Sequence, residues 1–137
     1  MNWEEAAVLV IGGDEGASSR VRFTAGTVCA VEVDGLDGTQ VRGEGPDLFE
    51  ALAAVRRILE AKGVRLACHG SRRDVFPSAM LRQSTAGRRA YVLEIPRTAA
   101  RPATVDIFGP APEAAVLATV DEQRAWFDNW QLAGESS

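Results

Sequence analysis

The alternation of apolar and polar positions in the first third of the chain predicts a series of antiparallel strands. The apolar run at 6–11 indicates a buried strand, and 20–24 alternates with period two, as a strand with one face in water does. A third strand is expected at 28–33 and a weaker fourth at 39–42. Because turns that contain glycine separate these segments, we expect neighbouring strands to pair as a meander.

The clearest single element is an amphipathic helix at 47–62. Its large apolar residues recur at the spacing i, i+4, i+7 and i+11 and therefore share one face: Leu48, Leu52, Val55 and Leu59. Asp47 can cap the first turn, and Glu50 three residues later completes a pattern like a capping box. Gly63 is expected to end the helix in the left-handed conformation. An apolar face of this width is typical of a helix that covers a sheet.

The rest of the chain predicts further strands and a second helix. Strands are expected at 64–68, 89–95 and 104–108. The long stretch 69–87, which lies between the first two of these strands, is expected to be a loop. Asp121 can cap a helix at 121–132, and Gly134 is expected to stop that helix.

The order of the elements, strands then helix and again strands then helix, predicts an α+β fold. We expect an antiparallel sheet of about six to seven strands, packed against the main amphipathic helix and the C-terminal helix. A length of 137 residues is typical of one domain and is sufficient for a hydrophobic core. We therefore expect a single domain at 1–133 and a frayed C-terminal tail at 134–137.

Composition indicates the cellular compartment in which the protein is expected to work. The chain has no run of about 18 apolar residues, so no membrane-spanning helix is expected. The acidic residues that follow Met1 do not fit a secretory signal, and we expect a cytoplasmic protein. In that reducing compartment Cys29 and Cys68 are expected to be buried thiols. Two cysteines and one histidine do not supply a closed zinc site, and neither a metal nor a cofactor is expected.

The charge of the chain is unevenly distributed. The window 65–101 holds eight arginines and two acidic residues, a net charge of +6, whereas the whole chain carries −4 and the remainder therefore −10. Such an asymmetry favours contact between one face of the molecule and an acidic or anionic partner. The net acidity of the whole chain disfavours nonspecific binding of nucleic acid, which needs a broad positive field.

Within this window, the stretch 69–89 is rich in the hydrogen-bond donors that an anion site requires. The candidate binding residues are Arg72, Arg73, Ser78, Arg82, Gln83, Arg88 and Arg89. Three interpretations remain open for these arginines. They are solvated or pair with the acidic surface of the same chain, they contact an acidic protein partner, or they hold a phosphate-type anion of a nucleotide or nucleic acid.

The single histidine, His69, directly follows Cys68, which suggests a nucleophile and its base. Neighbouring residues on a strand point to opposite faces, so these two side chains are not expected to touch each other. No catalytic residue is assigned for this reason. His69 is expected to be a hydrogen-bonded structural residue.

Part of the arginine-rich window carries a recognisable pattern, in the residues 66–80, Arg82, Gly87, Arg88 and 90–93. It resembles small uncharacterised proteins of GC-rich bacteria, which have a capped helix, a CNGAR…PSGM.R…GG.K.Y stretch and a short VDIF strand, here 105–108. The resemblance covers about residues 45–130 and implies no particular activity. Where the pattern has Asn and Gly this chain has His69 and Ala79, which weakens a catalytic role for His69. In size these proteins resemble immunity or accessory proteins of bacterial conflict systems.

Taken together, the sequence favours a non-enzymatic cytoplasmic protein-binding module, immunity-like or accessory, that contacts an acidic partner through its arginine-rich loop. The alternative is a small enzyme or ligand-binding domain. It would hold a phosphate-type anion, from a nucleotide or nucleic acid, with Arg72, Arg73 and Arg82.

The sequence also favours self-association. With several strands and only two helices, the strand edges at 39–42 and 104–108 are expected to be uncovered, and a symmetric homodimer is the commonest way to cover them. Trp126, Phe127 and Trp130 are expected to pack in the core. Of these, Trp126 or Trp130 is a candidate anchor for the homodimer.

Overall fold

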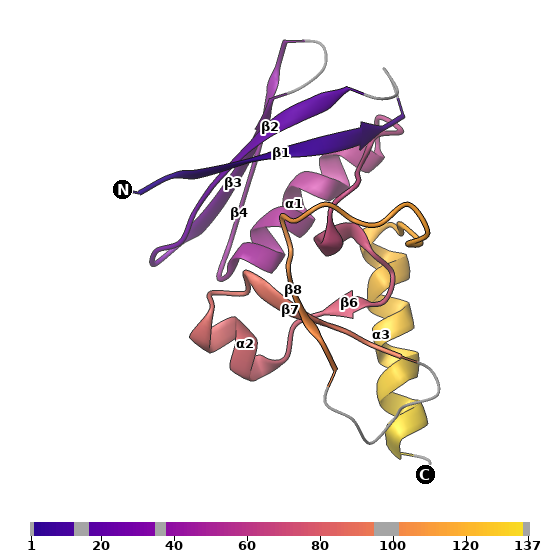
Figure 1. The fold of residues 1–137 in the computed structure, drawn as a ribbon. Helices are drawn as coiled ribbons and strands as arrows, with labels where there is room; N and C mark the ends of the chain where they lie inside the picture. The colour runs from indigo at the N-terminus through magenta and orange to yellow at the C-terminus, as the bar shows by residue number, and fades with distance from the viewer. Residues whose placement is uncertain (1, 13–16, 35–37, 95–101, 136–137) are drawn as a thin grey trace.

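The computed structural model describes residues 2–12, 17–34, 38–94 and 102–135, and within them it has eight strands (Figure 1). The first half of the chain forms β1 (Glu4–Ile11), β2 (Ser18–Thr24), β3 (Cys29–Asp34), β4 (Gln40–Gly45) and α1 (Leu48–Glu60). The second half forms β5 (Arg65–Leu66), the 3-10 helix η1 (His69–Ser71), β6 (Val75–Phe76), α2 (Ala79–Ser84), β7 (Arg89–Val92), β8 (Thr104–Asp106) and α3 (Val120–Glu135). The predicted α+β class is confirmed, but the strands form two antiparallel sheets rather than one.

The first sheet has the strand order β4-β3-β2-β1-β5, and every neighbouring pair in it is antiparallel. Its first four strands are the predicted meander. Phe23 lies opposite Val31 on the buried face, whereas Arg22 lies opposite Glu32 on the other face, with 3.4 Å between their charged atoms. The period-two pattern of the sequence therefore separates an apolar face from a charged one.

Helix α1 packs against the apolar face of this sheet, as its amphipathic pattern predicts (Figure 1). The side chain of Asp47 accepts a hydrogen bond of 2.8 Å from the backbone N–H of Glu50, which confirms the predicted cap. The Glu50 carboxylate instead contacts Arg82 and Arg124, so the pattern is half of a capping box. Gly63 follows the helix with φ of +73°, the left-handed conformation expected there.

The stretch 69–87 is not the single loop that the sequence predicts. It contains η1, β6 and α2, and β6 joins β7 and β8 in the second sheet, with Val75 opposite Val92. Helix α2 begins after Ser78, whose hydroxyl accepts a hydrogen bond of 3.1 Å from the N–H of Leu81. These elements span two to six residues, which is too short for apolar periodicity to reveal them.

Helix α3 differs from its prediction at both ends. Its cap is Thr119, whose hydroxyl accepts from the N–H of Glu122 at 3.1 Å while the Glu122 carboxylate accepts from the N–H of Thr119 at 2.8 Å. This reciprocal pair is a full capping box. Asp121 is therefore not the cap, and its carboxylate lies 2.9 Å from the guanidinium of Arg57 on α1. The helix also continues through Gly134 instead of stopping there.

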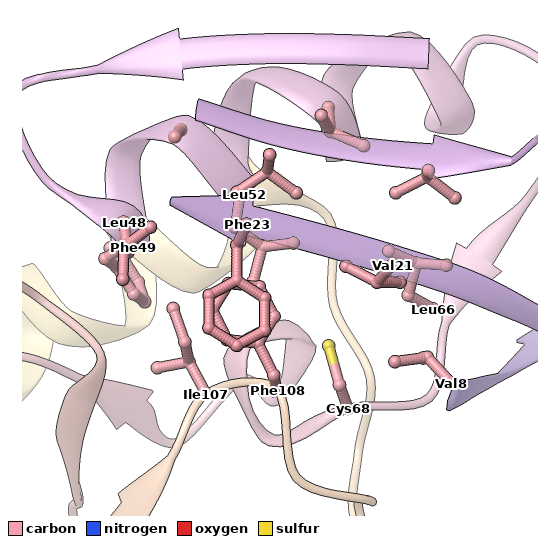
Figure 2. Close-up of a cluster of buried hydrophobic side chains, with 14 of the residues drawn as sticks. Val8, Val21, Phe23, Leu48, Phe49, Leu52, Leu66, Cys68, Ile107 and Phe108 are labelled. Atoms are coloured by element: carbon pink, nitrogen blue, oxygen red, sulfur yellow. The ribbon is translucent and has the colours of Figure 1, made fainter. Parts of the chain in front are cut away.

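Buried apolar residues from both sheets and from α1 form one contiguous cluster (Figure 2). Phe23 of the first sheet stacks on Phe108, which follows β8, with 3.9 Å between the ring centroids. Each large side chain buried in this way contributes roughly 1.5–3 kcal/mol. The position of β8 and its following turn is thus fixed by packing against the first sheet as well as by its pairing with β7.

Aromatic residues of α3 extend this cluster. Phe127 stacks on Phe76 of β6, with 3.9 Å between the ring centroids, and the indole N–H of Trp130 donates to the carbonyl of Glu94 at 3.1 Å. Trp126, Phe127 and Trp130 are partly buried against the core. They therefore pack as the sequence predicts, although at the margin of the core rather than at its centre.

Candidate functional site

The described part of the arginine-rich segment (residues 65–101) contains β5 of the first sheet and β6 and β7 of the second sheet. Arg97 and Arg101 lie outside the described residues. Arg72, Arg73 and Arg82 have separate sets of partners within the described residues.

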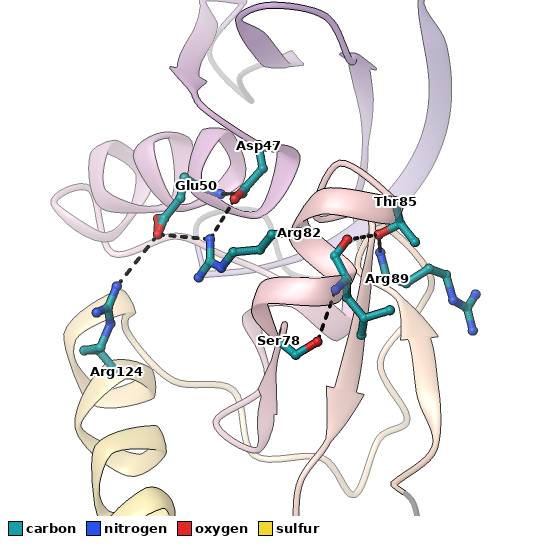
Figure 3. A network of polar contacts seen from close by, with 8 residues as sticks. Asp47, Glu50, Ser78, Arg82, Thr85, Arg89 and Arg124 are labelled. Atoms are coloured by element: carbon teal, nitrogen blue, oxygen red, sulfur yellow. Dashed lines mark hydrogen bonds and ion pairs between the residues drawn. The ribbon is translucent and has the colours of Figure 1, made fainter.

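Arg82 of α2 is bound to the first turn of α1 (Figure 3). Its guanidinium donates to the Asp47 carboxylate at 2.8 Å and to the Glu50 carboxylate at 3.5 Å. The same group lies over the rings of Phe49 and Phe76, 5.4 and 5.5 Å from their centroids. Opposite charge and aromatic faces both stabilise a guanidinium in this position. Arg82 therefore ties α2 to α1 and is only 25 % exposed.

Arg72 is held by the turn that follows η1. Its guanidinium donates to both carboxylate oxygens of Asp74, at 3.0 and 3.1 Å, a two-pronged contact that fixes its plane. A third nitrogen lies 3.1 Å from Nδ1 of His69. Because a guanidinium only donates, Nδ1 accepts and the ring proton of neutral His69 is on Nε2. Partial burial, and then the charge of Arg72, lower the pKa of His69.

Arg88 joins three strands. Its guanidinium donates to the Asp106 carboxylate of β8 at 3.1 and 3.2 Å and to the Glu4 carboxylate of β1 at 2.8 Å. It also lies over the ring of Phe23, 4.9 Å from the centroid. Arg88 thus connects the two sheets through side-chain contacts that span 84 positions of the sequence.

The other candidate binding residues are more available to a partner. Arg89 donates to the carbonyl and the hydroxyl of Thr104, both at 2.9 Å, and has no carboxylate within 4 Å among the described residues. Arg73 is exposed, and its backbone N–H donates to the carbonyl of Val116 at 2.9 Å. In the part of the chain that the structure describes, no carboxylate lies within 4 Å of the Arg73 guanidinium either. Gln83 is exposed on α2, whereas the hydroxyl of Ser78 is used as the cap.

A buried polar cluster that the sequence does not predict lies beneath this segment. Arg56 of α1 is 4 % exposed, and its guanidinium donates to the Gly70 carbonyl at 3.0 Å, the Gln123 side-chain oxygen at 2.7 Å and the Ala118 carbonyl at 2.8 Å. Gln123 of α3 is 1 % exposed and donates to the carbonyls of Gly70, Arg72 and Val75 at 2.8–2.9 Å. The pair therefore fixes α3, α1 and the chain around η1 in one arrangement.

The positive charge of the Arg56 guanidinium is stabilised by the dipoles of carbonyl and amide groups rather than by a carboxylate. No acidic group of the described residues lies within 4 Å of its guanidinium, and burial lowers its pKa. A cavity of about 10 Å³ between Arg56, Arg65, Ser71 and Ala118 has room for about one water molecule. Within the described residues, every buried side-chain nitrogen and oxygen has a hydrogen-bond partner. These features are those of a structural cluster, because its polar groups are already satisfied.

Both cysteines are free and buried, as predicted. Cys68 lies 3.5 Å from the hydroxyl of Ser71, and burial raises the pKa of its thiol. A thiol with a raised pKa is a poor nucleophile at neutral pH. The geometry therefore gives Cys68 the role of a core residue.

Titration with a thiol reagent is expected to show this directly. In native protein both Cys29 and Cys68 should react slowly, because burial excludes the reagent and keeps the Cys68 thiol protonated. In denaturant, both thiols should react at once. Rapid modification of either one in the native protein, or a stable bridge on a non-reducing gel, would contradict the arrangement.

Comparison with known proteins adds no family. The chain matched neither a protein-family model nor a curated protein. The resemblance to small proteins of GC-rich bacteria thus stays a prediction. No helix in the described ranges has the length and apolar character needed to span a membrane, and no group of three or more His, Cys, Asp or Glu side chains there is placed to hold a metal ion.

Proposed function

We propose that the chain is a non-enzymatic, cytoplasmic protein-binding module, immunity-like or accessory, that contacts an acidic partner through the exposed part of the arginine-rich segment. The observation that carries this proposal is that the strongest donors of the segment are already occupied. Arg72, Arg82 and Arg88 each bind different carboxylates on different elements. Arg73 and Arg89, which have no carboxylate partner among the described residues, stay available to an acidic polypeptide.

A phosphate-type anion is the less favoured ligand because the strongest donors are already occupied. To reach it, Arg72 would have to leave Asp74, and Arg82 would have to leave both Asp47 and Glu50. Each move would break charge-assisted hydrogen bonds within the molecule. The free energy gained by binding phosphate would therefore have to exceed the free energy lost with these hydrogen bonds.

Among the candidate binding residues, Arg73 is exposed and Arg89 is half-buried, and neither has a carboxylate partner in the described ranges, with Gln83 as an uncharged donor. Charges at exposed positions act mainly on the association rate and on salt dependence, since solvent and ions screen them. Binding through these residues should consequently be strongest at low ionic strength. The apolar part of the binding free energy would come from contacts between the partner and the residues around these two arginines.

The double charge reversal Arg73→Glu and Arg89→Glu is expected to weaken binding of an acidic polypeptide about tenfold at low salt. Poly-L-glutamate serves as the probe, with affinity measured by titration calorimetry or fluorescence anisotropy. Lys62→Glu is the control for each single reversal, because it makes the same change of charge and Lys62 is exposed but lies outside the segment, just after α1. Thermal melting of each variant verifies that loss of the Arg89 contacts with Thr104 has not unfolded the protein.

The anion-binding alternative is tested with inorganic phosphate, ATP and a single-stranded oligonucleotide as ligands. The proposal predicts no stabilisation of the protein by phosphate or ATP in a thermal-shift experiment. Stabilisation by phosphate that is lost in Arg72→Ala and in Arg82→Ala would support the anion-binding alternative. Equal weakening by Lys62→Glu would show attraction to the whole molecule rather than to this segment.

A further inference from the structure

The first sheet has an open edge at β4. Strand β4 pairs with β3 on one side, and no strand of the described residues pairs with it on the other. Such an edge presents a row of backbone N–H and C=O groups to any strand that can approach it. β4 (Gln40–Gly45) contains no proline and no bulge that would blunt this edge.

Helix α1 approaches this strand closely. A side chain on Gly43 would place its Cβ 2.6 Å from the carbonyl oxygen of Ala51 and 2.9 Å from the Cβ of Ala54. Ala54 therefore lies directly beside Gly43. Ile58 follows one turn later on the same face of the helix and is 43 % exposed. Ala54, which is half-buried, and the exposed Ile58 thus form an apolar strip along the helix, and this strip begins beside β4.

The solvent face of β4 carries one positive and one negative side chain. Arg42 and Glu44 are 47 % and 55 % exposed, and they stand two residues apart with Gly43 between them. Within the chain Arg42 contacts Glu44 at 3.2 Å and Glu32 at 3.0 Å. Much of both side chains still faces water, so each can accept a further partner across the edge.

We propose that two copies of the chain associate through this edge, with β4 of one antiparallel to β4 of the other and the two-fold axis at Gly43. In this register Arg42 lies opposite Glu44 of the second copy, and Glu44 opposite Arg42. Opposite charges on directly facing positions of antiparallel strands stabilise the pair. The contact is also self-complementary, as a two-fold interface must be.

Neighbouring registers are less favourable. With the axis at Arg42, that arginine lies opposite itself, and with the axis at Glu44 the two carboxylates meet. A shift by one residue would place the solvent-facing side chains of one strand opposite inward-facing positions of the other. The charge pattern therefore selects the axis at Gly43.

The same axis brings the two α1 helices together. Because Ala54 lies beside Gly43, the two-fold axis places Ala54 of one copy near Ala54 of the other. Small side chains there allow helices to approach to the usual 8–10 Å. The dimer would then cover Ile58, which is exposed in the single chain. This surface does not include Arg73 or Arg89, so the inference is independent of the proposed function.

Sedimentation velocity over a dilution series tests the proposal. The chain should shift from the 14.7 kDa monomer towards twice that mass as concentration rises. Glu44→Arg should raise the dissociation constant at least about tenfold, because both Arg–Glu contacts across the axis become Arg–Arg contacts. Asp128→Arg, the same charge change on an exposed position of α3, is the control and should leave association unchanged.

A mixing experiment identifies the register. Arg42→Glu should also be monomeric, since two acidic pairs then face each other. An equimolar mixture of Arg42→Glu and Glu44→Arg should form a dimer again, because the acidic edge of one variant meets the basic edge of the other. A monomer mass for the wild type at every concentration, an unchanged dimer in Glu44→Arg, or no recovery in the mixture would each overturn the proposal.

Discussion

Replacement of Arg56 by alanine is expected to lower the free energy of unfolding by about 3–5 kcal/mol. The substitution removes a buried side chain and leaves a cavity. It also removes the donor to the carbonyl of Ala118 and to the side-chain oxygen of Gln123, both of which lie inside the protein. The carbonyl of Gly70 keeps a donor, because Gln123 also binds it. Most of the loss therefore comes from two unsatisfied acceptors and the lost packing.

Arg57→Ala is the matched control, since it removes the same side chain from the next position of α1. Arg57 is 55 % exposed, and its contact with Asp121 is a surface ion pair. Pairs of this kind contribute about 0–1 kcal/mol. Urea denaturation followed by circular dichroism gives both values. A loss in Arg56→Ala no larger than that in Arg57→Ala would show that the cluster does not hold α3 and η1 on α1.

Replacement of Gly43 by alanine should cost about 2–3 kcal/mol, the second large effect. The new methyl group would lie 2.6 Å from the carbonyl oxygen of Ala51 and 2.8 Å from the nitrogen of Val55. These are backbone atoms of α1, so the helix as a whole would have to move away from the sheet. Glycine is thus required here by the closeness of two elements rather than by its backbone conformation.

Gly26→Ala provides the control for this prediction. The nearest atom to a Cβ at Gly26 is the carbonyl oxygen of Val28 at 3.7 Å, an ordinary contact distance. The free energy of unfolding of Gly26→Ala should differ from that of the unsubstituted protein by about 0.5 kcal/mol or less. Both variants are measured by urea denaturation in the dilute, monomeric range. If Gly43→Ala is as stable as Gly26→Ala, the helix does not lie as close to β4 as described.

Elements with strong local patterns could be predicted from the sequence. The meander and α1 follow from apolar periodicity, and the Asp47 cap follows from the residue at the helix start. The division into two sheets could not be predicted, because it depends on which distant strands pair. The sequence predicts Asp121 as the cap of α3, but Thr119 and Glu122 form the capping box, because several residues there can cap a helix.

The partners and the burial of each arginine are harder to predict from the sequence. Arg72 pairs with Asp74 two positions away, which the sequence allows. Arg82 and Arg88 find carboxylates 35 and 84 positions away, at Asp47 and Glu4, and only the fold brings these together. Burial of Arg56 is likewise a tertiary effect. The apolar pattern of α1 places Arg56 outside the apolar face, but α3 covers this part of the helix.

The most direct test of the proposed function observes the arginine side chains themselves. NMR spectra of the guanidinium Nε–H groups are recorded while poly-L-glutamate is added at low salt. The account predicts that the signals of Arg73 and Arg89 shift with added polypeptide, whereas those of Arg72, Arg82 and Arg88 keep their positions because their internal carboxylates hold them. Shifts confined to Arg72 and Arg82, or no shift at Arg73 and Arg89 at saturating polypeptide, would contradict it.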